Sequence, residues 1–141
     1  MDLDAALRWA ADRKHATLIT IRSDGRPQSS DIVYRLADGA FVVSVTANRA
    51  KTVNMGRDPR VVLHISDPAS WSYLSFDGTA SLSSVTVDPS DDASNALVDY
   101  YRAVAGEDHS DWPAYRKAMI DEQRLLVTIR PESVVGQIRN A

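Results

Sequence analysis

The sequence predicts a mainly β protein of the α+β class, in which a small antiparallel β-barrel is flanked by helices. Short segments rich in β-branched and apolar residues recur along the first half of the chain at a spacing of roughly ten residues. Asp24-Gly25 and Asp38-Gly39 separate the first three segments and favour tight hairpin turns. Parallel strands need long crossover connections, so short turns favour a barrel over a parallel sheet.

We expect residues 1–141 to form a single domain. Its first half is expected to hold one helix, several strands and a second, short helix. A first helix capped by Asp2 or Asp4 runs to about Arg13, because apolar residues recur there at helical spacing. Strands are expected over 16–21, 28–36, 40–45, 60–65 and 71–82, with a bend at Gly78 and a short helix over 49–57.

The second half is expected to hold two helices and a final strand. Asp88-Pro89 predicts a helix start with Asp88 as the cap and Pro89 at the first position. Gly106 predicts the end of that helix, and Ser110 or Asp111 begins the next one. The last strand, 124–130, is expected to end at Pro131, with a short strand near 134–138 after it.

Composition excludes several functional classes. The chain has 16 Lys and Arg against 19 Asp and Glu, a net charge of −3, which disfavours a general nucleic-acid surface. It has no cysteine, so disulfides, thiolate metal sites and cysteine nucleophiles are excluded. No apolar run approaches the roughly 18 residues that span a bilayer, and the first residues do not resemble a signal peptide. We therefore expect a soluble, cytoplasmic protein that binds neither nucleic acid nor membrane.

The start of the short helix is the most informative stretch. Asn48 is expected to cap it, since an Asn side chain accepts a backbone N–H of the first turn. Arg49 and Lys51 then place two positive charges where the helix dipole is already positive and acidic residues are preferred. A phosphate or carboxylate bound at this point would make the arrangement favourable. The alternative is a surface helix with two solvated basic side chains.

Side chains that could carry out catalysis are scarce. His15, His64 and His109 fall on three different elements and do not have the spacing of a helical metal site. The sequence contains no G-x-S-x-G elbow and no glycine-rich phosphate loop. We expect no metal and no catalytic side chain, so a bound cofactor would carry the chemistry while the protein orients it.

A set of short motifs, in order along nearly the whole chain, resembles one known superfamily. The motifs are 17–21, 24–28, 49–54, 58–60, 71–73, 78–80, 100–102, 109–112 and 115–116. The chain resembles the flavin and deazaflavin split β-barrel proteins typified by pyridoxamine 5′-phosphate oxidase. It looks closest to the actinobacterial branch that uses the deazaflavin coenzyme F420.

The resemblance implies a homodimer of six-stranded split barrels with the cofactor in a groove between the subunits. It implies that Lys51 pairs with the cofactor phosphate and that Arg49 contacts the phosphate or the tail beyond it. Around them, Thr52 and Asn54 would add hydrogen bonds, Ser44, Val45 and Thr46 would lie along the ribityl chain and ring, Pro27, Gln28 and Ser29 would approach the ring edge, and Trp71 and Tyr73 would come from the other subunit.

The implied activity is hydride transfer from reduced F420 to a planar conjugated acceptor such as biliverdin, a quinone or an enone. Arg49, Arg57 and Arg60 could hold the oligoglutamate tail that distinguishes F420 from flavin mononucleotide (FMN). Three alternatives stay open: an FMN-dependent oxidoreductase of the same fold, a non-catalytic F420 carrier, and a haem-handling barrel with His64 or His109 as axial ligand. We do not expect the vitamin oxidase activity itself, because the residues after the last expected strand do not resemble the C-terminal extension with which those oxidases bind substrate and flavin.

Overall fold

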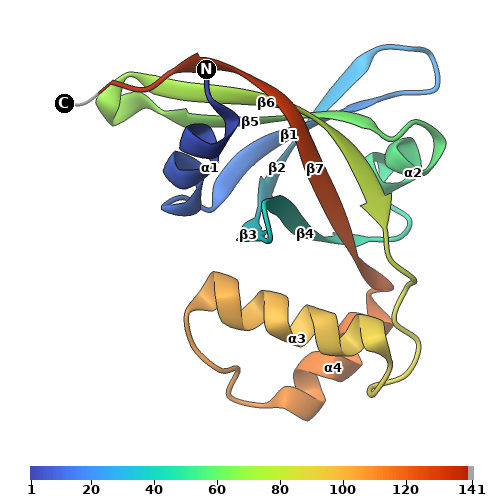
Figure 1. The fold of residues 1–141 in the computed structure, drawn as a ribbon. Helices are drawn as coiled ribbons and strands as arrows, with labels where there is room; N and C mark the ends of the chain where they lie inside the picture. Colours follow the sequence, from blue (N-terminus) through green and yellow to red (C-terminus); the bar gives the residue numbers. More distant parts are fainter. Residues whose placement is uncertain (140–141) are drawn as a thin grey trace.

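The computed structural model describes residues 1–139, which form one antiparallel sheet and four α-helices. The sheet curls into a half-barrel with the strand order β2-β1-β5-β6-β7-β4-β3 (Figure 1). The strands are β1 His15–Ile21, β2 Pro27–Val33, β3 Arg35–Ala37, β4 Ala40–Thr46, β5 Arg60–Asp67, β6 Ser72–Leu82 and β7 Arg124–Gln137. The helices are α1 Leu3–Ala11, α2 Ala50–Arg57, α3 Asp92–Ala105 and α4 Trp112–Asp121, with a 3₁₀ turn, η1, at Pro68–Ser70. The prediction of a mainly β, antiparallel α+β fold is confirmed.

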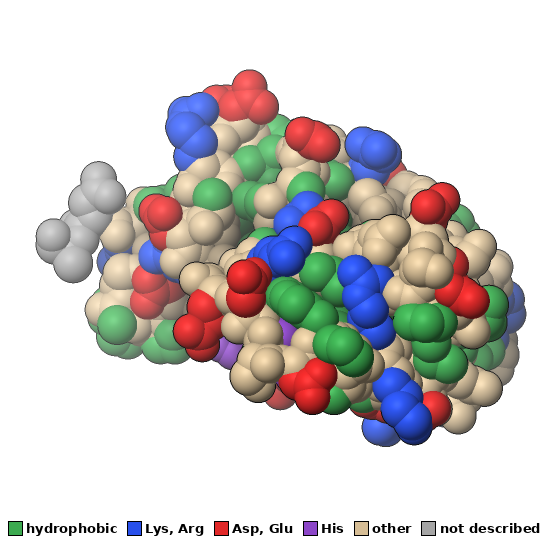
Figure 2. Space-filling model, turned by 90° about the horizontal axis from the view of Figure 1, so that it is seen from below, with side chains coloured by type: hydrophobic (Ala, Val, Ile, Leu, Met, Phe, Trp, Pro, Cys, Tyr) green, Lys and Arg blue, Asp and Glu red, His purple; other side chains and the backbone are tan. Residues whose placement is uncertain are grey.

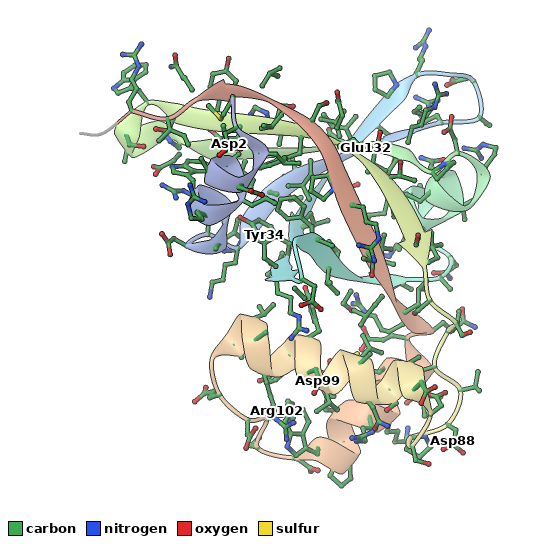
Figure 3. All side chains as sticks on the ribbon, in the orientation of Figure 1. Asp2, Tyr34, Asp88, Asp99, Arg102 and Glu132 are labelled. Atoms are coloured by element: carbon green, nitrogen blue, oxygen red, sulfur yellow. The ribbon has the colours of Figure 1, made fainter. Side chains whose placement is uncertain are left out.

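Seven strands form instead of six because Tyr34 interrupts the segment expected to be one strand over 28–36. Its backbone N–H donates to the Lys14 carbonyl at 2.8 Å, and its hydroxyl donates to the Ala10 carbonyl at 2.7 Å. Tyr34 is thus held against the end of α1 (Figure 3). The two pieces, β2 and β3, lie at opposite edges of the sheet, so the chain itself joins the two edges of the curled sheet at this residue.

The concave side of the sheet encloses the core. At its centre, Phe41 packs edge-on against Tyr34 and Phe76, with ring centroids 5.1 Å and 5.0 Å apart. Helix α1 closes one end, burying Ala6 and Ala10. Its cap is Asp2, one of the two residues expected, and it ends two residues before the expected Arg13.

A β-bulge explains why the last strand is longer than expected. Asp77 pairs with Ser133 and Gly78 pairs with Pro131, so Glu132 is the extra residue. The pairing is irregular at Gly78, where a bend was expected. The expectation that the strand ends at Pro131 is wrong, since β7 continues to Gln137. β4 pairs with β7 only as far as Ile129. The missing N–H of Pro131 therefore interrupts no hydrogen-bonding ladder with β4.

Helices α3 and α4 lie below the sheet in Figure 1 and cover β4 and β7. Val42 and Leu126 pack there against Leu97, Val98 and Tyr115. Gly106 ends α3 at a φ of +74° and Asp111 caps α4, as predicted.

The expected cap of α3, Asp88, is wrong. Asp91 caps the helix instead, because its carboxylate accepts hydrogen bonds from the Thr86 hydroxyl and from the N–H groups of Val87, Asp88 and Ser94. The loop folds around this one carboxylate, and Pro89 is left in the turn before the helix.

None of the helices in residues 1–139 is both long and apolar enough to cross a membrane. Figure 2 shows the face seen from below, with basic and acidic side chains interspersed over it.

Candidate functional site

The helix α2 begins one residue later than expected, and this changes how its first turn is capped. The Arg49 N–H donates to the Thr46 carbonyl at 3.1 Å, which keeps Asn48 in the preceding turn. Arg49 occupies the cap position, and its side chain makes no capping hydrogen bond. The prediction of Asn48 as cap is therefore wrong. The first-turn N–H groups of α2 have no side-chain acceptor, which leaves them available to an anion.

Three cations gather at this helix start, one more than the sequence analysis found. Besides Arg49 and Lys51, Arg124 lies here because it pairs directly with Thr46 across the β4–β7 ladder. The pKa of Lys51 is lowered from its ordinary value, first by burial and then by the charges of Arg49 and Arg124. Such crowding of like charges costs free energy, and a bound anion would relieve it.

Neither Arg49 nor Lys51 has a carboxylate partner within residues 1–139. Both Arg49 and Arg124 line a hollow of about 630 Å³ between the start of α2 and the α4–β7 turn. We call it the α2 hollow; its lining is Thr46, Asn48, Arg49, Asp121, Glu122, Gln123 and Arg124. The two carboxylates in it are paired, Asp121 with Lys117 at 2.6 Å and Glu122 with Arg124 at 3.0 Å. The hollow thus keeps surplus positive charge on the α2 side.

The inner side of α2 is held by hydrogen bonds that use two residues expected at the cofactor. The Thr52 hydroxyl donates to the Thr46 carbonyl at 2.7 Å. The Asn54 amide donates to the Thr20 hydroxyl at 3.1 Å and to the Gln28 side-chain oxygen at 3.0 Å. Thr52 and Asn54 are buried, so both fix the helix against β4, β1 and β2.

The two arginines expected to hold a cofactor tail are engaged elsewhere. Arg57 donates to the Ile21 carbonyl at 3.1 Å and to the Asn54 side-chain oxygen at 2.7 Å. Arg60 makes two hydrogen bonds to Asp58, at 3.0 Å and 2.7 Å, and these lower the pKa of Asp58 to about 2. Arg124, which lines the α2 hollow with Arg49, is likewise bound to a carboxylate, Glu122, through hydrogen bonds of 3.1 Å and 3.0 Å. Arg49 and Lys51 are therefore the cations at the start of α2 that have no carboxylate partner among residues 1–139.

The remaining predicted site residues fall in three places. Ser44 and Thr46 are half-buried on the face of β4 that α3 and α4 cover farther along, whereas the Val45 side chain lies in the core. Pro27 and Ser29 are exposed on the convex side of β2, next to the Gln28 that contacts α2.

Trp71 and Tyr73 lie near the β5–β6 turn, at the opposite end of the sheet from α2 (Figure 1). They are 75% and 42% exposed. Trp71 has a left-handed φ of +56°, and its carbonyl accepts a 3.0 Å hydrogen bond from Gln137. Within one subunit these aromatics do not meet the α2 hollow.

Sequence reasoning missed Arg124 as a site residue. It was expected as the first residue of the last strand, but no local pattern connects that position with residue 46. Only the pairing of β7 with β4 brings them together.

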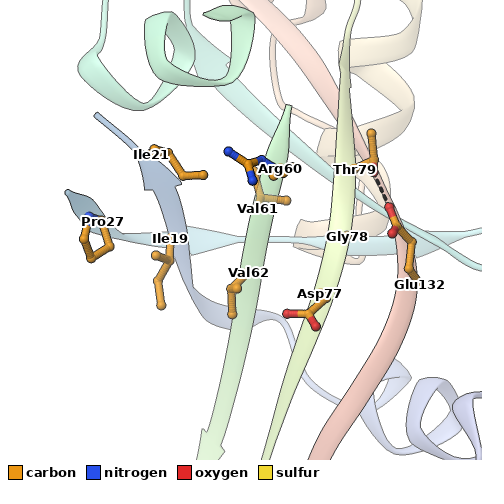
Figure 4. Close-up of a pocket in the computed structure, with 10 residues that line it drawn as sticks. All are labelled: Ile19, Ile21, Pro27, Arg60, Val61, Val62, Asp77, Gly78, Thr79 and Glu132. Atoms are coloured by element: carbon orange, nitrogen blue, oxygen red, sulfur yellow. Dashed lines mark hydrogen bonds between the residues drawn. The ribbon is translucent and has the colours of Figure 1, made fainter. Parts of the chain in front are cut away.

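A second hollow, of about 410 Å³, lies on the convex side of the sheet (Figure 4). We call it the outer groove. Its lining is Ile19, Ile21, Pro27, Arg60, Val61, Val62, Asp77, Gly78, Thr79 and Glu132. Its link to α2 runs through Ile21, whose carbonyl accepts the hydrogen bond from Arg57.

The three histidines remain apart. His64 stacks on Tyr73 with ring centroids 5.7 Å apart, and His109 packs among Tyr101, Trp112 and Tyr115. Within residues 1–139, no group of three or more His, Asp or Glu side chains is placed to hold a metal ion.

Comparison with known proteins agrees with this architecture. The family model described as pyridoxamine 5′-phosphate oxidase matches residues 3–137. The chain belongs to this family. Its members share the split-barrel frame found here, and the resemblance noted from the motifs is confirmed.

Solved structures of the superfamily are similar at low identity. A conserved hypothetical protein from Mycobacterium tuberculosis superposes with a TM-score of 0.76 at 23% identity, over 98% of this chain and 85% of that one. A protein described as an F420 reductase gives 0.67 at 21% identity, over 91% and 94%. A heme binding protein from Mycobacterium smegmatis gives 0.65 at 26% identity, over 91% of this chain and 50% of that one. Proteins whose descriptions name different cofactors, F420 and heme, therefore share this fold.

Proposed function

We propose that this family member is an oxidoreductase that uses reduced coenzyme F420 to reduce a planar conjugated acceptor of the biliverdin, quinone or enone kind. One observation carries the proposal. Arg49 and Lys51 stand at an uncapped helix start without carboxylate partners among the described residues, and Arg124 stands beside them. This donor set suits an anionic cofactor, since its charges repel one another until an anion is bound.

Different residues of the chain would bind different parts of the cofactor. Lys51 and the first-turn N–H groups of α2 would hold the phosphate, with Arg49 and Arg124 at the next anionic groups. Ser44, Thr46 and the backbone of Val45 would follow the ribityl chain, and Pro27, Gln28 and Ser29 would border the ring. Thr52 and Asn54 would act by holding α2 and Gln28 in place, since their hydrogen-bonding groups are already used.

F420 is favoured over FMN by the shape of the site. The α2 hollow continues past Arg49 to the α4–β7 turn, which leaves room for a chain that extends beyond the phosphate. FMN ends at its phosphate and would leave this space unused. FMN remains the alternative cofactor for the same residues.

When bound, the reduced deazaflavin would supply a hydride to one acceptor carbon, and a proton from solvent would complete the two-electron reduction. No side chain need be a nucleophile. The protein would contribute by holding the acceptor within about 3–3.5 Å of the donor carbon and by keeping the ring in place through its phosphate.

A homodimer is part of the proposal. Trp71 and Tyr73 are exposed aromatic side chains that lie far from the α2 hollow of their own subunit. In a dimer they would flank the cofactor groove of the partner subunit, where exposed aromatics commonly anchor an interface.

The test is a titration of the purified protein with F420 and with FMN, followed by fluorescence, with light scattering to count subunits. We expect F420 to bind more tightly than FMN, and reduced F420 to be oxidised when a conjugated acceptor is added. A yellow protein that prefers FMN would replace the cofactor, and tight F420 binding without turnover would indicate a carrier.

Haem is the second candidate, because one of the similar structures is described as a heme binding protein and His64 is half-buried beside Tyr73. Adding haemin tests it. A Soret band that is lost in His64→Ala, together with no F420 binding, would overturn the oxidoreductase.

A further inference from the structure

The outer groove has the form of a small-molecule site. Side chains two residues apart on a strand share one face, so Ile19 and Ile21 of β1 form a floor together with Val62 of β5 (Figure 4). Asp77 and Glu132 form the wall on the β6 and β7 side. The volume of about 410 Å³ lies within the usual range for ligand sites, which are mostly apolar with a few polar groups.

The charge of the groove is opposite to that of the α2 hollow. Arg60 is neutralised by its two hydrogen bonds to Asp58. Asp77 accepts a hydrogen bond from the Ser133 hydroxyl at 3.0 Å, and Glu132 accepts one from the Thr79 hydroxyl. Neither carboxylate has a basic partner among residues 1–139. Two negative charges therefore remain unpaired beside an apolar floor.

We propose that the outer groove is the acceptor subsite and that it takes a flat heterocycle carrying N–H donors or a positive charge along one edge. The inference rests on the proposed function, which requires an acceptor next to the cofactor, and it narrows the acceptors to those with an N–H edge, of the biliverdin kind, since quinones and enones present only oxygen acceptors to the two carboxylates. The apolar floor would hold the ring, and Asp77 and Glu132 would accept hydrogen bonds from its edge.

The groove lies where such an acceptor is needed. Arg57, at the end of α2, donates to the carbonyl of Ile21 in the floor. Pro27, which pairs with Ile21 across the β1–β2 ladder, is followed by Gln28, which contacts Asn54 of the same helix. Helix α2 has eight residues, a length of about 12 Å at 1.5 Å per residue. The phosphate of a cofactor held at Lys51 and an acceptor in the groove would thus lie near opposite ends of one short helix, and the cofactor ring, bordered by Pro27, would reach from one to the other.

Two flat probes of similar size and opposite charge test the proposal. Proflavine is a tricyclic cation with two amino groups, and acridine-9-carboxylate is a tricyclic anion. Binding is followed by fluorescence polarisation in the protein alone and with saturating F420. We expect proflavine to bind, acridine-9-carboxylate to bind at least about tenfold more weakly, and F420 to leave proflavine bound.

Variants locate the binding. Asp77→Asn and Glu132→Gln should each weaken proflavine binding by about five- to tenfold, the loss expected for one partly exposed charge-assisted contact. Asp38→Asn is the matched control. It removes the same charge from an exposed turn with a φ of +54°, which Asn tolerates, and it should leave binding unchanged. Val62→Trp should fill the floor and abolish binding while the melting temperature confirms folding.

Several results would overturn the proposal. Equal affinity for the two probes would remove the charge argument, and unchanged binding in Asp77→Asn and Val62→Trp would place the probe elsewhere. Displacement of proflavine by F420 would make the groove part of the cofactor site. Conversion of a dimer to monomers by Val62→Trp would show that a second copy covers it. If F420 does not bind at all, the proposed function fails separately, since the probe measurements on the protein alone still report on the groove.

Discussion

The Lys51→Ala variant tests whether Lys51 binds the cofactor phosphate or is only a solvated surface cation. In the protein without cofactor, burial lowers the pKa of Lys51, and the neighbouring charges of Arg49 and Arg124 lower it further. Its removal should therefore relieve repulsion, and the melting temperature should stay the same or rise slightly. With cofactor present, the same substitution removes a charge-assisted contact to the phosphate.

The size of the loss follows from the environment of the contact. A hydrogen bond between charged groups contributes about 1.5–3 kcal/mol. Lys51 is only partly buried, so we take the lower half of that range, about 1.5–2 kcal/mol. At 1.4 kcal/mol per factor of ten, the Kd for F420 should rise about 10- to 30-fold. The rate of hydride transfer from bound cofactor should change much less.

The pH dependence gives an internal control. The pKa of Lys51 lies below its ordinary value of 10.5, so Lys51 loses its proton at a lower pH than an ordinary lysine does. Cofactor affinity should fall as the pH rises through that pKa, and Lys51→Arg, which keeps its charge, should remove the fall. Because the folded form holds this proton less tightly, the free energy of unfolding should rise over the window between the lowered pKa and 10.5.

The assay is a fluorescence titration with F420 at several pH values, with thermal unfolding of the cofactor-free variants alongside. An unchanged Kd in Lys51→Ala would refute the assignment of the phosphate. A large drop in melting temperature with a small change in Kd would make Lys51 a structural residue.

Three further predictions concern stability. Asn54→Ala should cost about 2–3 kcal/mol by leaving Thr20 and Gln28 without their buried partner, whereas Asn48→Ala, at an exposed position that caps nothing, should be neutral in the same urea unfolding experiment. Asp91→Ala should cost about 1 kcal/mol through the lost cap; because the pKa of Asp91 is lowered to about 2, its contribution should be present above about pH 4 and disappear as the pH falls toward 2, as circular dichroism can follow. Gly78→Ala should cost about 1–3 kcal/mol, since a Cβ there would lie 2.9 Å from the Arg130 carbonyl oxygen; a variant as stable as the wild type would contradict the bulge geometry.

Sequence patterns correctly predicted the features that depend only on neighbouring residues. The hairpin turns at Asp24-Gly25 and Asp38-Gly39 and the end of α3 at Gly106 depend on residues within one turn. The predictions failed where a distant partner intervened. Asp88 precedes a proline and looks like a cap, but Asp91 gathers four donors from the loop around it.

Pro131 is a second residue at which distant contacts overrode the local sequence pattern. A proline usually ends a strand because it cannot donate to its neighbour. Here the bulge at Gly78 and the end of β4 pairing at Ile129 mean that no such donation is needed. Neither fact can be read from the residues around Pro131.

The order of amino acids was enough to place Arg49 and Lys51 together at a helix start, because residues 49 to 51 lie within one helical turn of about 3.6 residues whatever the rest of the chain does. Folding alone added Arg124 to them, bound Arg57 to the Ile21 carbonyl of β1, and turned Asn54 toward Thr20 and Gln28. These contacts depend on which segments become neighbours in the curled sheet. They join residues far apart along the chain, and no local sequence pattern predicts which residues will meet.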